Sequence, residues 1–455
     1  MSHLIDIILF PLYVALFALL FAWRRKKINS PVLKKYHHLG FWVKVFSALA
    51  YVIFSLFFAK VDSTFLYYPE GINITKLILK DFTNIKLLFS AGKDFDSNLL
   101  ADSFNKGYFN SESNYFIAKA VTVFSFFSFG SYSVITLFFS MISFSGVWRL
   151  YRFFYEQYPH LHKQLAIAVL FLPNFVFWSS GILKDPLCTG MIGWFTYSMY
   201  GAFIKKQSII KNILVALIAA TVLGIVKAYI LFSYLPFFML FIFITYLKQI
   251  KEAFFRIVLL IFIFVTAGLG IVLVGEKLQS EMEDLALNKL AESVQTSQES
   301  FMRIANLAES SFSLGVEFDG STLGLLKIAP AGMVATLYRP FLWEANNAAA
   351  FLSALESLAI MLFTLYVFFR AGPVTFFGGI LKNQMIMYCL LYALVFAIFV
   401  GVTTLNFGTL VRYKIPCMPF YVIALLLILE RHRIKKPRNT GANHHEKAEK
   451  EISGC

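Results

Sequence analysis

Apolar segments long enough to cross a membrane recur along most of this chain. A helix needs about 20 consecutive apolar residues to cross the hydrocarbon core of a bilayer, and segments near this length alternate with short basic or polar connections. Hydrophobic residues make up 58% of the chain and charged residues 15%, which is more apolar surface than a soluble domain of this length can bury. The sequence therefore predicts an all-α polytopic integral membrane protein.

About 11 transmembrane helices are expected, in a single transmembrane domain over residues 1–430. The expected spans are 4–22, 41–59, one within 116–148, 165–180, 186–203, 209–226, 230–246, 257–274, 350–369, 385–404 and 415–430. Basic residues favour the cytoplasmic side. The block Arg24–Lys27 after the first span therefore predicts an N-terminus outside and a cytoplasmic C-terminus, with a basic, disordered tail over 431–455. The same rule accounts for much of the net charge of +15, so nucleic acid is not an expected partner.

This orientation leaves two large outer (periplasmic) loops, at about 61–115 and 275–348. The first carries an amphipathic stretch, Ile72 to Phe89, which is typical of a helix lying on the membrane surface. The second begins with a stretch, Glu276 to Ser313, that is expected to form a polar helix.

A short connection, Phe177 to Pro186, joins two of the expected spans. Its Ser-Ser-Gly sequence predicts a tight turn, after which Asp185 is expected to be the N-cap and Pro186 the first residue of the next helix. This places Lys184 at the outer mouth of a helical hairpin, beside a helix N-terminus that favours anions.

Five basic residues are expected at outer helix ends, where such residues are otherwise disfavoured. They are Lys184, Lys227, Arg339, Arg412 and Lys414. Each alone could be a side chain that reaches to the interface without a partner. Together they predict a site for an anion, and phosphate is the obvious anionic group at a membrane.

Three of these cations lie in two segments with further features. Arg339 is followed by Glu344 among aromatic residues, which fits either an interfacial belt or a pocket wall that holds both a cation and a carboxylate. Arg412 and Lys414 precede Pro416 and Pro419, which predicts a broken helix start; irregular backbone at membrane depth is tolerated mainly where it lines a cavity or is buried in protein.

Asp62 and Glu70 are the candidates for a general base that activates a sugar hydroxyl. They lie closest to the end of the second span and to aromatic residues. The later loop residues Asp94, Asp96 and Asp102 fit solvated carboxylates better, and Asp185 is expected to be a helix cap first.

The remaining residue types exclude several classes of chemistry. Seven histidines are expected on the cytoplasmic side: His37, His38, His160, His162, His432, His444 and His445. The four cysteines have no metal-ligand spacing. No nucleotide-phosphate loop, dinucleotide fingerprint or metalloprotease helix is present. The sequence implies no cofactor and no metal ligands, and it leaves open whether a divalent cation takes part.

The layout of many spans, a long acidic first outer loop and an outer pocket resembles the GT-C superfamily of membrane glycosyltransferases. The segment Arg412–Phe420 looks like the last-helix motif of many bacterial members, and Phe177–Pro186 and Tyr338–Ala345 look like stretches of related envelope proteins. The resemblance implies a polyprenyl-phosphate-linked sugar as donor, Asp62 as base and Arg412 as a contact to the donor phosphate. The outside N-terminus and the lack of a paired-acid motif depart from the superfamily.

The leading hypothesis is a glycosyltransferase of the bacterial inner membrane that acts on the periplasmic side in cell-envelope glycan synthesis, with the lipid-linked sugar and membrane lipids as its partners. A polysaccharide polymerase or ligase of the O-antigen type would need a similar outer pocket. A transporter or lipid flippase would need buried ionisable residues within the spans and broken helices, and Glu356 is the best such residue. A non-catalytic assembly subunit is the third alternative.

Overall fold

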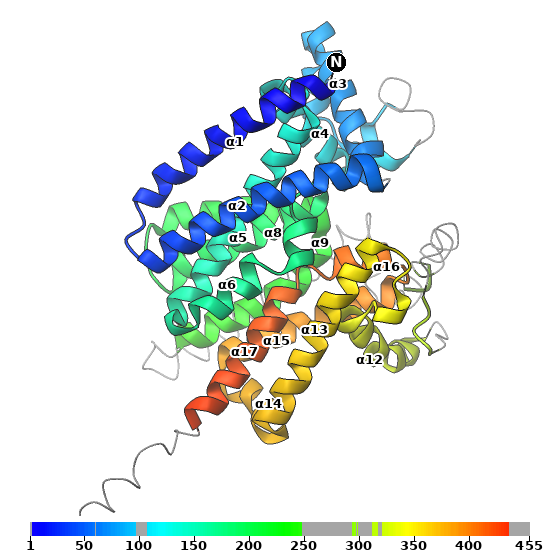
Figure 1. The fold of residues 1–455 in the computed structure, drawn as a ribbon. Helices are drawn as coiled ribbons and strands as arrows, with labels where there is room; N and C mark the ends of the chain where they lie inside the picture. Colours follow the sequence, from blue (N-terminus) through cyan, green and yellow to red (C-terminus); the bar gives the residue numbers. More distant parts are fainter. Residues whose placement is uncertain are drawn as a thin grey trace, which may run out of the picture.

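The fold, taken from a computed structural model, is built of helices (Figure 1). The structure describes residues 2–59, 61–96, 107–247, 294–296, 298, 312–316 and 321–435, and within these ranges there is no β-strand.

Fifteen labelled α-helices make up most of the described chain. Their bounds are α1 Ser2–Lys26, α2 Pro31–Ile53, α3 Tyr68–Lys80, α4 Glu112–Ser128, α5 Tyr132–Gln157, α6 His162–Leu170, α7 Pro173–Trp178, α8 Lys184–Phe203, α9 Ile209–Leu247, α12 Thr322–Tyr338, α13 Ala348–Ala371, α14 Pro373–Lys382, α15 Gln384–Thr403, α16 Phe407–Tyr413 and α17 Met418–Lys435. Short π-helical (η1, η2) and 3-10 turns lie between them, at η1 Phe54–Phe58, η2 Ser63–Tyr67, η3 Phe82–Leu88, η4 Gly92–Asp94, η5 Tyr108–Asn110, η6 Pro159–Leu161 and η7 Leu342–Glu344.

Polar residues with short side chains begin several of the apolar helices. The side chains of Ser30, Ser131, Asn347 and Asn383 each accept a hydrogen bond from a backbone N–H in the first turn of the helix that follows. These bonds satisfy donors that have no partner within the helix. The caps therefore fix where α2, α5, α13 and α15 begin.

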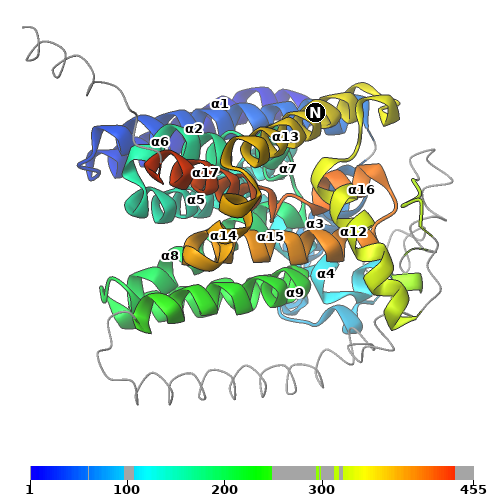
Figure 2. The ribbon, with the colours of Figure 1, turned by 90° about the horizontal axis from the view of Figure 1, so that it is seen from below.

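The helices are stacked in layers. Figure 2 shows α1 and α2 along one side of the molecule and α9 along the opposite side. Between them, α5 contacts both α2 and α8, and α8 in turn contacts α9. Among the C-terminal helices, α12 and α17 contact α15, which also contacts α9, and α13 packs against α12 and α17. The N-terminal helices α1 to α9 and the C-terminal helices α12 to α17 thus share one apolar core.

Glycines allow α5 and α8 to touch backbone to backbone. A Cβ atom on Gly146 would lie 1.8 Å from the carbonyl oxygen of Gly190, and one on Gly193 would lie 1.9 Å from that of Gly146. Small residues at such a crossing let two helices gain close van der Waals contact, which is a main source of helix association in membranes. This contact holds α8, and with it the start of that helix, against the centre of the bundle.

Six described helical segments are long and apolar enough to cross a membrane. They are Asp6–Lys26, Pro31–Phe58, Tyr132–Gln157, Ile209–Tyr246, Ala348–Ala371 and Gln384–Thr403. The pair α16 and α17, which bend by 61° at their junction, make a seventh if counted as one span. The protein is therefore an all-α polytopic membrane protein, and the broken helix start expected around Arg412 is confirmed.

The expected count of about 11 spans is not reached in the described part of the chain. The expected span at 165–180 is interrupted between α6 and α7, because Pro173 cannot continue the preceding helix. The helix α8, expected as the span 186–203, is not among the six and contains three glycines and several hydroxyl residues. The expected span 257–274 lies outside the described residues, and the orientation of the termini stays a prediction.

Residues 116–148 form two helices where one span was expected. Phe129 and Gly130 both have positive φ angles, of 52° and 73°, and Ser131 caps the helix that follows. This left-handed turn ends α4 and lets α5 start in a new direction. Only α5 is among the candidate spans.

The helix α9 folds back on itself at Lys227. This residue has φ −152° and ψ 78°, which are not helical angles. The Lys206 ammonium lies 5.8 Å from the centre of the Tyr246 ring, although a straight helix of 39 residues would be roughly 58 Å long. The expected turn at Lys227 is therefore confirmed, and its two arms account for the single long segment Ile209–Tyr246.

Both outer loops contain packed helices. In the first loop, the amphipathic stretch forms α3 and η3, and Ile74 and Ile78 are buried within the protein. Gly71 permits this, because a Cβ there would lie 2.5 Å from the side chain of Val121 in α4. In the second loop, most of 276–313 lies outside the described residues, and 322–338 form the helix α12, which contacts α15. Helix α17 continues to Lys435, five residues beyond the expected start of the tail, and 436–455 lie outside the described residues.

We expect the substitution Gly146→Ala to destabilise the protein by roughly 1–3 kcal/mol, because its methyl group has no room beside α8. The measurement is the apparent melting temperature in detergent. Gly224→Ala in α9 is the matched control, since a Cβ there has nothing within 4 Å. Equal melting temperatures for the two variants would show that α5 and α8 are not in close contact.

Candidate functional site

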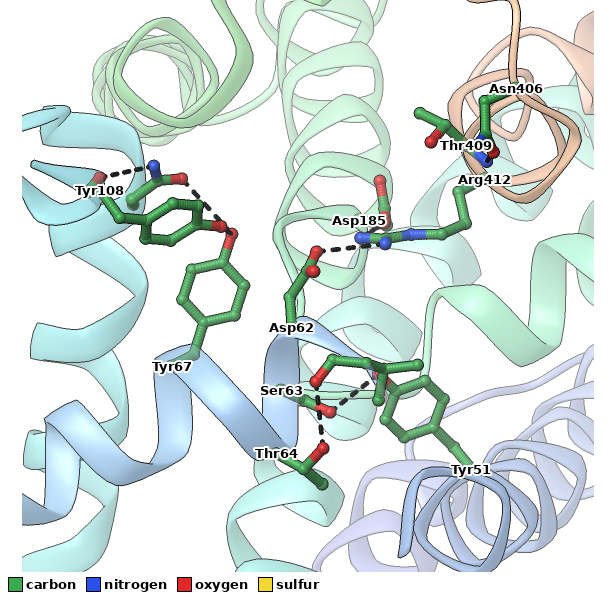
Figure 3. A network of polar contacts seen from close by, with 12 residues as sticks. Tyr51, Asp62, Ser63, Thr64, Tyr67, Tyr108, Asp185, Asn406, Thr409 and Arg412 are labelled. Carbon is green, nitrogen blue, oxygen red and sulfur yellow. Dashed lines mark hydrogen bonds and ion pairs between the residues drawn. The ribbon is translucent and has the colours of Figure 1, made fainter. Parts of the chain in front are cut away.

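Four charged side chains from four separate segments meet where helices begin, bend or end. Asp62 lies just before η2, Asp185 in the first turn of α8, Lys227 at the bend of α9 and Arg412 in the last turn of α16. Figure 3 shows Asp62 and Asp185 pointing toward Arg412. We call these four residues the charge cluster.

The charge cluster is a chain of ion pairs. The Lys227 ammonium donates to Oδ1 of Asp185 at 2.6 Å. The Arg412 guanidinium donates through Nη2 to Oδ2 of Asp185 at 3.5 Å and through Nη1 to Oδ2 of Asp62 at 3.2 Å. Two carboxylates and two cations therefore balance in charge, as groups removed from water require.

Burial of the side chains decreases from Asp185 through Arg412 to Asp62. The side chain of Asp185 is 2% exposed and that of Lys227 is 6% exposed, while Arg412 is 18% and Asp62 39% exposed. Asp62 caps no helix with its carboxylate. It is therefore the member of the charge cluster that a molecule from outside can reach, and Arg412 lies directly behind it.

A buried lysine fixes the loop that leads to Asp185. The Lys44 ammonium, in the middle of α2, donates to the carbonyl oxygen and the hydroxyl of Ser179 at 2.6 Å each, to the Ser180 hydroxyl at 3.2 Å and to the Ser143 hydroxyl at 3.1 Å. Gly181 follows against the ring of Tyr51, where a Cβ would lie 2.2 Å from a ring carbon. The Ser-Ser-Gly turn is thus held on both sides.

Sequence reasoning missed Lys44. It is 3% exposed and lies within the candidate span Pro31–Phe58. An ionisable residue inside an apolar span is itself a sign of function. That signal was available, but the acceptors from α5 and from the turn after α7 could not be read from the sequence.

The start of α8 differs from the expectation. The helix begins at Lys184 after Leu183, whose side chain makes no capping bond. Asp185 lies inside the first turn, so its carboxylate is not a cap and pairs with Lys227 and Arg412 instead. Lys184 donates to the Ser113 hydroxyl at 2.7 Å at the N-terminal end of α4.

Aromatic rings cover the cations of the charge cluster. The Arg412 guanidinium lies 5.5 Å from the centre of the Trp178 ring, and the Lys227 ammonium lies 4.3 Å from that of Tyr413. Such contacts stabilise cations that have lost water.

Hydroxyl groups surround Asp62 on the side away from Arg412 (Figure 3). Tyr51 donates to Ser63 at 3.1 Å, and Tyr108 donates to Tyr67 at 2.9 Å. Burial raises the pKa of Tyr108 to about 12, so this hydroxyl keeps its proton at neutral pH. The hydroxyl groups beside Asp62 are therefore uncharged, and Arg412 is its ion-pair partner among the described residues.

The other predicted cations form a second group. The Arg339 guanidinium binds both carboxylate oxygens of Glu344, through Nε at 2.9 and 3.1 Å, and donates to the carbonyl oxygen of Ser313 at 2.8 Å. Lys414, 2% exposed, donates to the carbonyl oxygen of Arg339 at 2.9 Å and to the Ser357 hydroxyl at 2.8 Å. Of the five cations, two thus belong to the charge cluster and two to this second group, while Lys184 lies apart at Ser113. Each of the five already has a hydrogen-bond acceptor within the protein.

The remaining candidate acids lie elsewhere. Glu70 is buried in the first turn of α3, where Asn73 donates to it at 3.4 Å. Asp94 and Asp96 are exposed, and Asp102 lies outside the described residues. Among the described side chains, no three His, Cys, Asp or Glu residues are grouped closely enough to hold a metal ion.

We expect Lys227→Met to lower the free energy of unfolding by roughly 3–5 kcal/mol, because it leaves the buried carboxylate of Asp185 with only its longer bond to Arg412. Thermal unfolding in detergent measures the loss. The control Lys211→Met, an exposed lysine on the same helix, should change stability by less than about 0.5 kcal/mol. The double variant Asp185→Asn/Lys227→Met should be more stable than Lys227→Met alone; if it is less stable, the two side chains do not form a pair.

Comparison with known proteins gives no further guide to this arrangement: no protein-family model, no curated protein and no solved structure matches the chain.

Proposed function

We propose that the protein is a membrane glycosyltransferase that takes its sugar from a polyprenyl-phosphate-linked donor. The observation that carries the proposal is the pair of Asp62 and Arg412: an accessible carboxylate lies 3.2 Å from a guanidinium that is held from behind by the buried Asp185. The Asp62 carboxylate can accept a proton, and the adjacent Arg412 guanidinium can bind phosphate.

In this proposal Asp62 accepts the proton of an acceptor hydroxyl, and that oxygen forms a bond to the anomeric carbon of the donor sugar. The bond between that carbon and the phosphate oxygen breaks, and its electron pair stays on the phosphate. Arg412 stabilises the negative charge that develops there, as a fixed cation in a site sheltered from water does most effectively.

The neighbouring groups position Arg412. Asp185, which is itself paired with Lys227, holds the guanidinium from the buried side. Lys414 ties the end of α16 to the backbone of Arg339 and to α13 through Ser357. Lys184, beside α4, supplies a further positive charge near the donor phosphates. A site of this kind on the periplasmic face of a bacterial inner membrane suits cell-envelope glycan synthesis, and a glycan polymerase or ligase would use the same groups.

A transporter or lipid flippase is the second candidate, and Lys44 favours it. This lysine is buried inside a candidate span, and both α9 and the α16–α17 pair are broken helices. A flippase would move a labelled polyprenyl phosphate between the leaflets of vesicles without transferring sugar, and Lys44→Met would stop that movement.

For the transferase we expect the gently extracted protein to retain a polyprenyl phosphate or diphosphate that native mass spectrometry detects. Arg412→Ala should lose this lipid, because the contact to phosphate is gone. Asp62→Asn should retain a lipid that still carries its sugar, since binding persists and proton transfer does not.

The control for both variants is Asp94→Asn, an exposed loop carboxylate of the same region. It should behave as the unmodified protein. Arg412→Lys, which keeps the charge, separates loss of lipid from loss of folding if Arg412→Ala melts early. Ordinary phospholipid alone on every variant would remove the main support for the transferase.

A further inference from the structure

A second basic site lies at the other end of α2. A cavity of about 450 Å³ opens where α1 ends and α2 begins. The residues that line it are Arg25, Lys26, Lys34, Lys35, His38 and Leu39. We call it the basic pocket. Its volume lies in the range of small-molecule sites and exceeds what one inorganic phosphate needs.

The cations of the basic pocket differ from those of the charge cluster because they have no carboxylate partners. No acidic side chain lines the cavity. Within the described ranges, no ion pair joins Arg25, Lys26, Lys34 or Lys35 to an aspartate or glutamate. Four positive charges therefore face a shared space, and no carboxylate among the described residues pairs with them.

The helices give these charges a fixed arrangement. Lys34 and His38 are one turn apart on the same face of α2, whose start is set by the Ser30 cap and Pro31. Arg25 and Lys26 come from the last turn of α1. The positive-inside rule explains why basic residues lie at a helix end. It does not require that basic residues from two helices line the same cavity.

The surface beside the basic pocket is apolar and exposed. On α1, Leu19, Leu20 and Trp23 are 71%, 49% and 57% exposed, and Leu39 at the pocket itself is 41% exposed. Both helices that form the pocket are candidate spans. An occupant with acyl chains could therefore lie along α1 while its headgroup fills the cavity.

The basic pocket and the charge cluster lie at opposite ends of α2. This helix of 23 residues is roughly 35 Å long, close to the thickness of a bilayer's hydrocarbon core, and η1 extends it toward Asp62. The two sites therefore belong to opposite membrane boundaries, and the inference made here does not rest on the proposed function.

We propose that the basic pocket binds the headgroup of an anionic phospholipid that carries two phosphates. Four cations from two helices provide two for each of the two phosphate groups, and the exposed apolar face of α1 can contact the acyl chains. The ligand is a structural or regulatory lipid, distinct from the donor at Asp62.

The experiment titrates the purified protein with diphosphatidylglycerol and counts the bound lipids by native mass spectrometry. The variant Lys34→Gln/Lys35→Gln should bind roughly 10- to 30-fold more weakly, since each lysine near an anionic headgroup adds to the attraction. The control Lys211→Gln/Lys382→Gln removes two other exposed lysines and should keep the affinity of the unmodified protein. Phosphatidylcholine should bind all three proteins equally.

Equal loss of affinity in both double variants would overturn the proposal, because lipid affinity would then depend on the net charge of the protein and not on the basic pocket. Inorganic pyrophosphate, added in equal amount, tests the source of the phosphates. If it displaces the lipid, the pocket is a site for a free anion and the lipid assignment is wrong. If the lipid stays bound, the acyl chains contribute as proposed.

Discussion

The pairing of Asp185 with Lys227 and Arg412 is the contact on which the site depends. It ties the first turn of α8 to the bend of α9 and to the end of α16, three segments that come from different parts of the chain. Asp185 holds two cations while nearly removed from water, so neither cation can leave without exposing a buried charge. Asp62, in front of Arg412, is the most exposed member of the charge cluster.

Much of the fold could be predicted where hydropathy alone decides the structure. The helices α1, α2, α13 and α15 follow the apolar runs, and the bends at Lys227 and after Arg412 lie where polar or proline residues interrupt them. Prediction was less successful where close contact between backbones, and not hydropathy, determines how the helices pack. The α5–α8 contact depends on glycines, and in the sequence alone a glycine indicates only a low helix propensity. The helix α12 lies in a segment that the sequence predicts to be a loop.

Part of the site could also be predicted. Asp62, Asp185, Lys227 and Arg412 each lie at the end or bend of an apolar segment, where a charge is conspicuous. Their mutual pairing could not be foreseen, because it depends on how four segments converge. For the same reason the sequence suggested one open group of five cations, whereas the structure places them in two pairs, with Lys184 apart, and gives each an acceptor within the protein. Lys44 shows the opposite case, since its place within a span was a signal that the prediction did not use.

The bend of α9 has a consequence for biosynthesis. A hairpin inserted into a bilayer carries the residue at its tip across the apolar phase, at a cost of about 2.5–3.5 kcal/mol for a lysine at the centre. The tip of α9 is Lys227, and its partner Asp185 is synthesised 42 residues earlier. The ribosome thus delivers the carboxylate first, on a helix that already precedes the hairpin in the chain. The acidic partner of Lys227 is therefore already present in the chain when the bend of α9 forms, so the order of the two charges along the chain allows them to pair without delay.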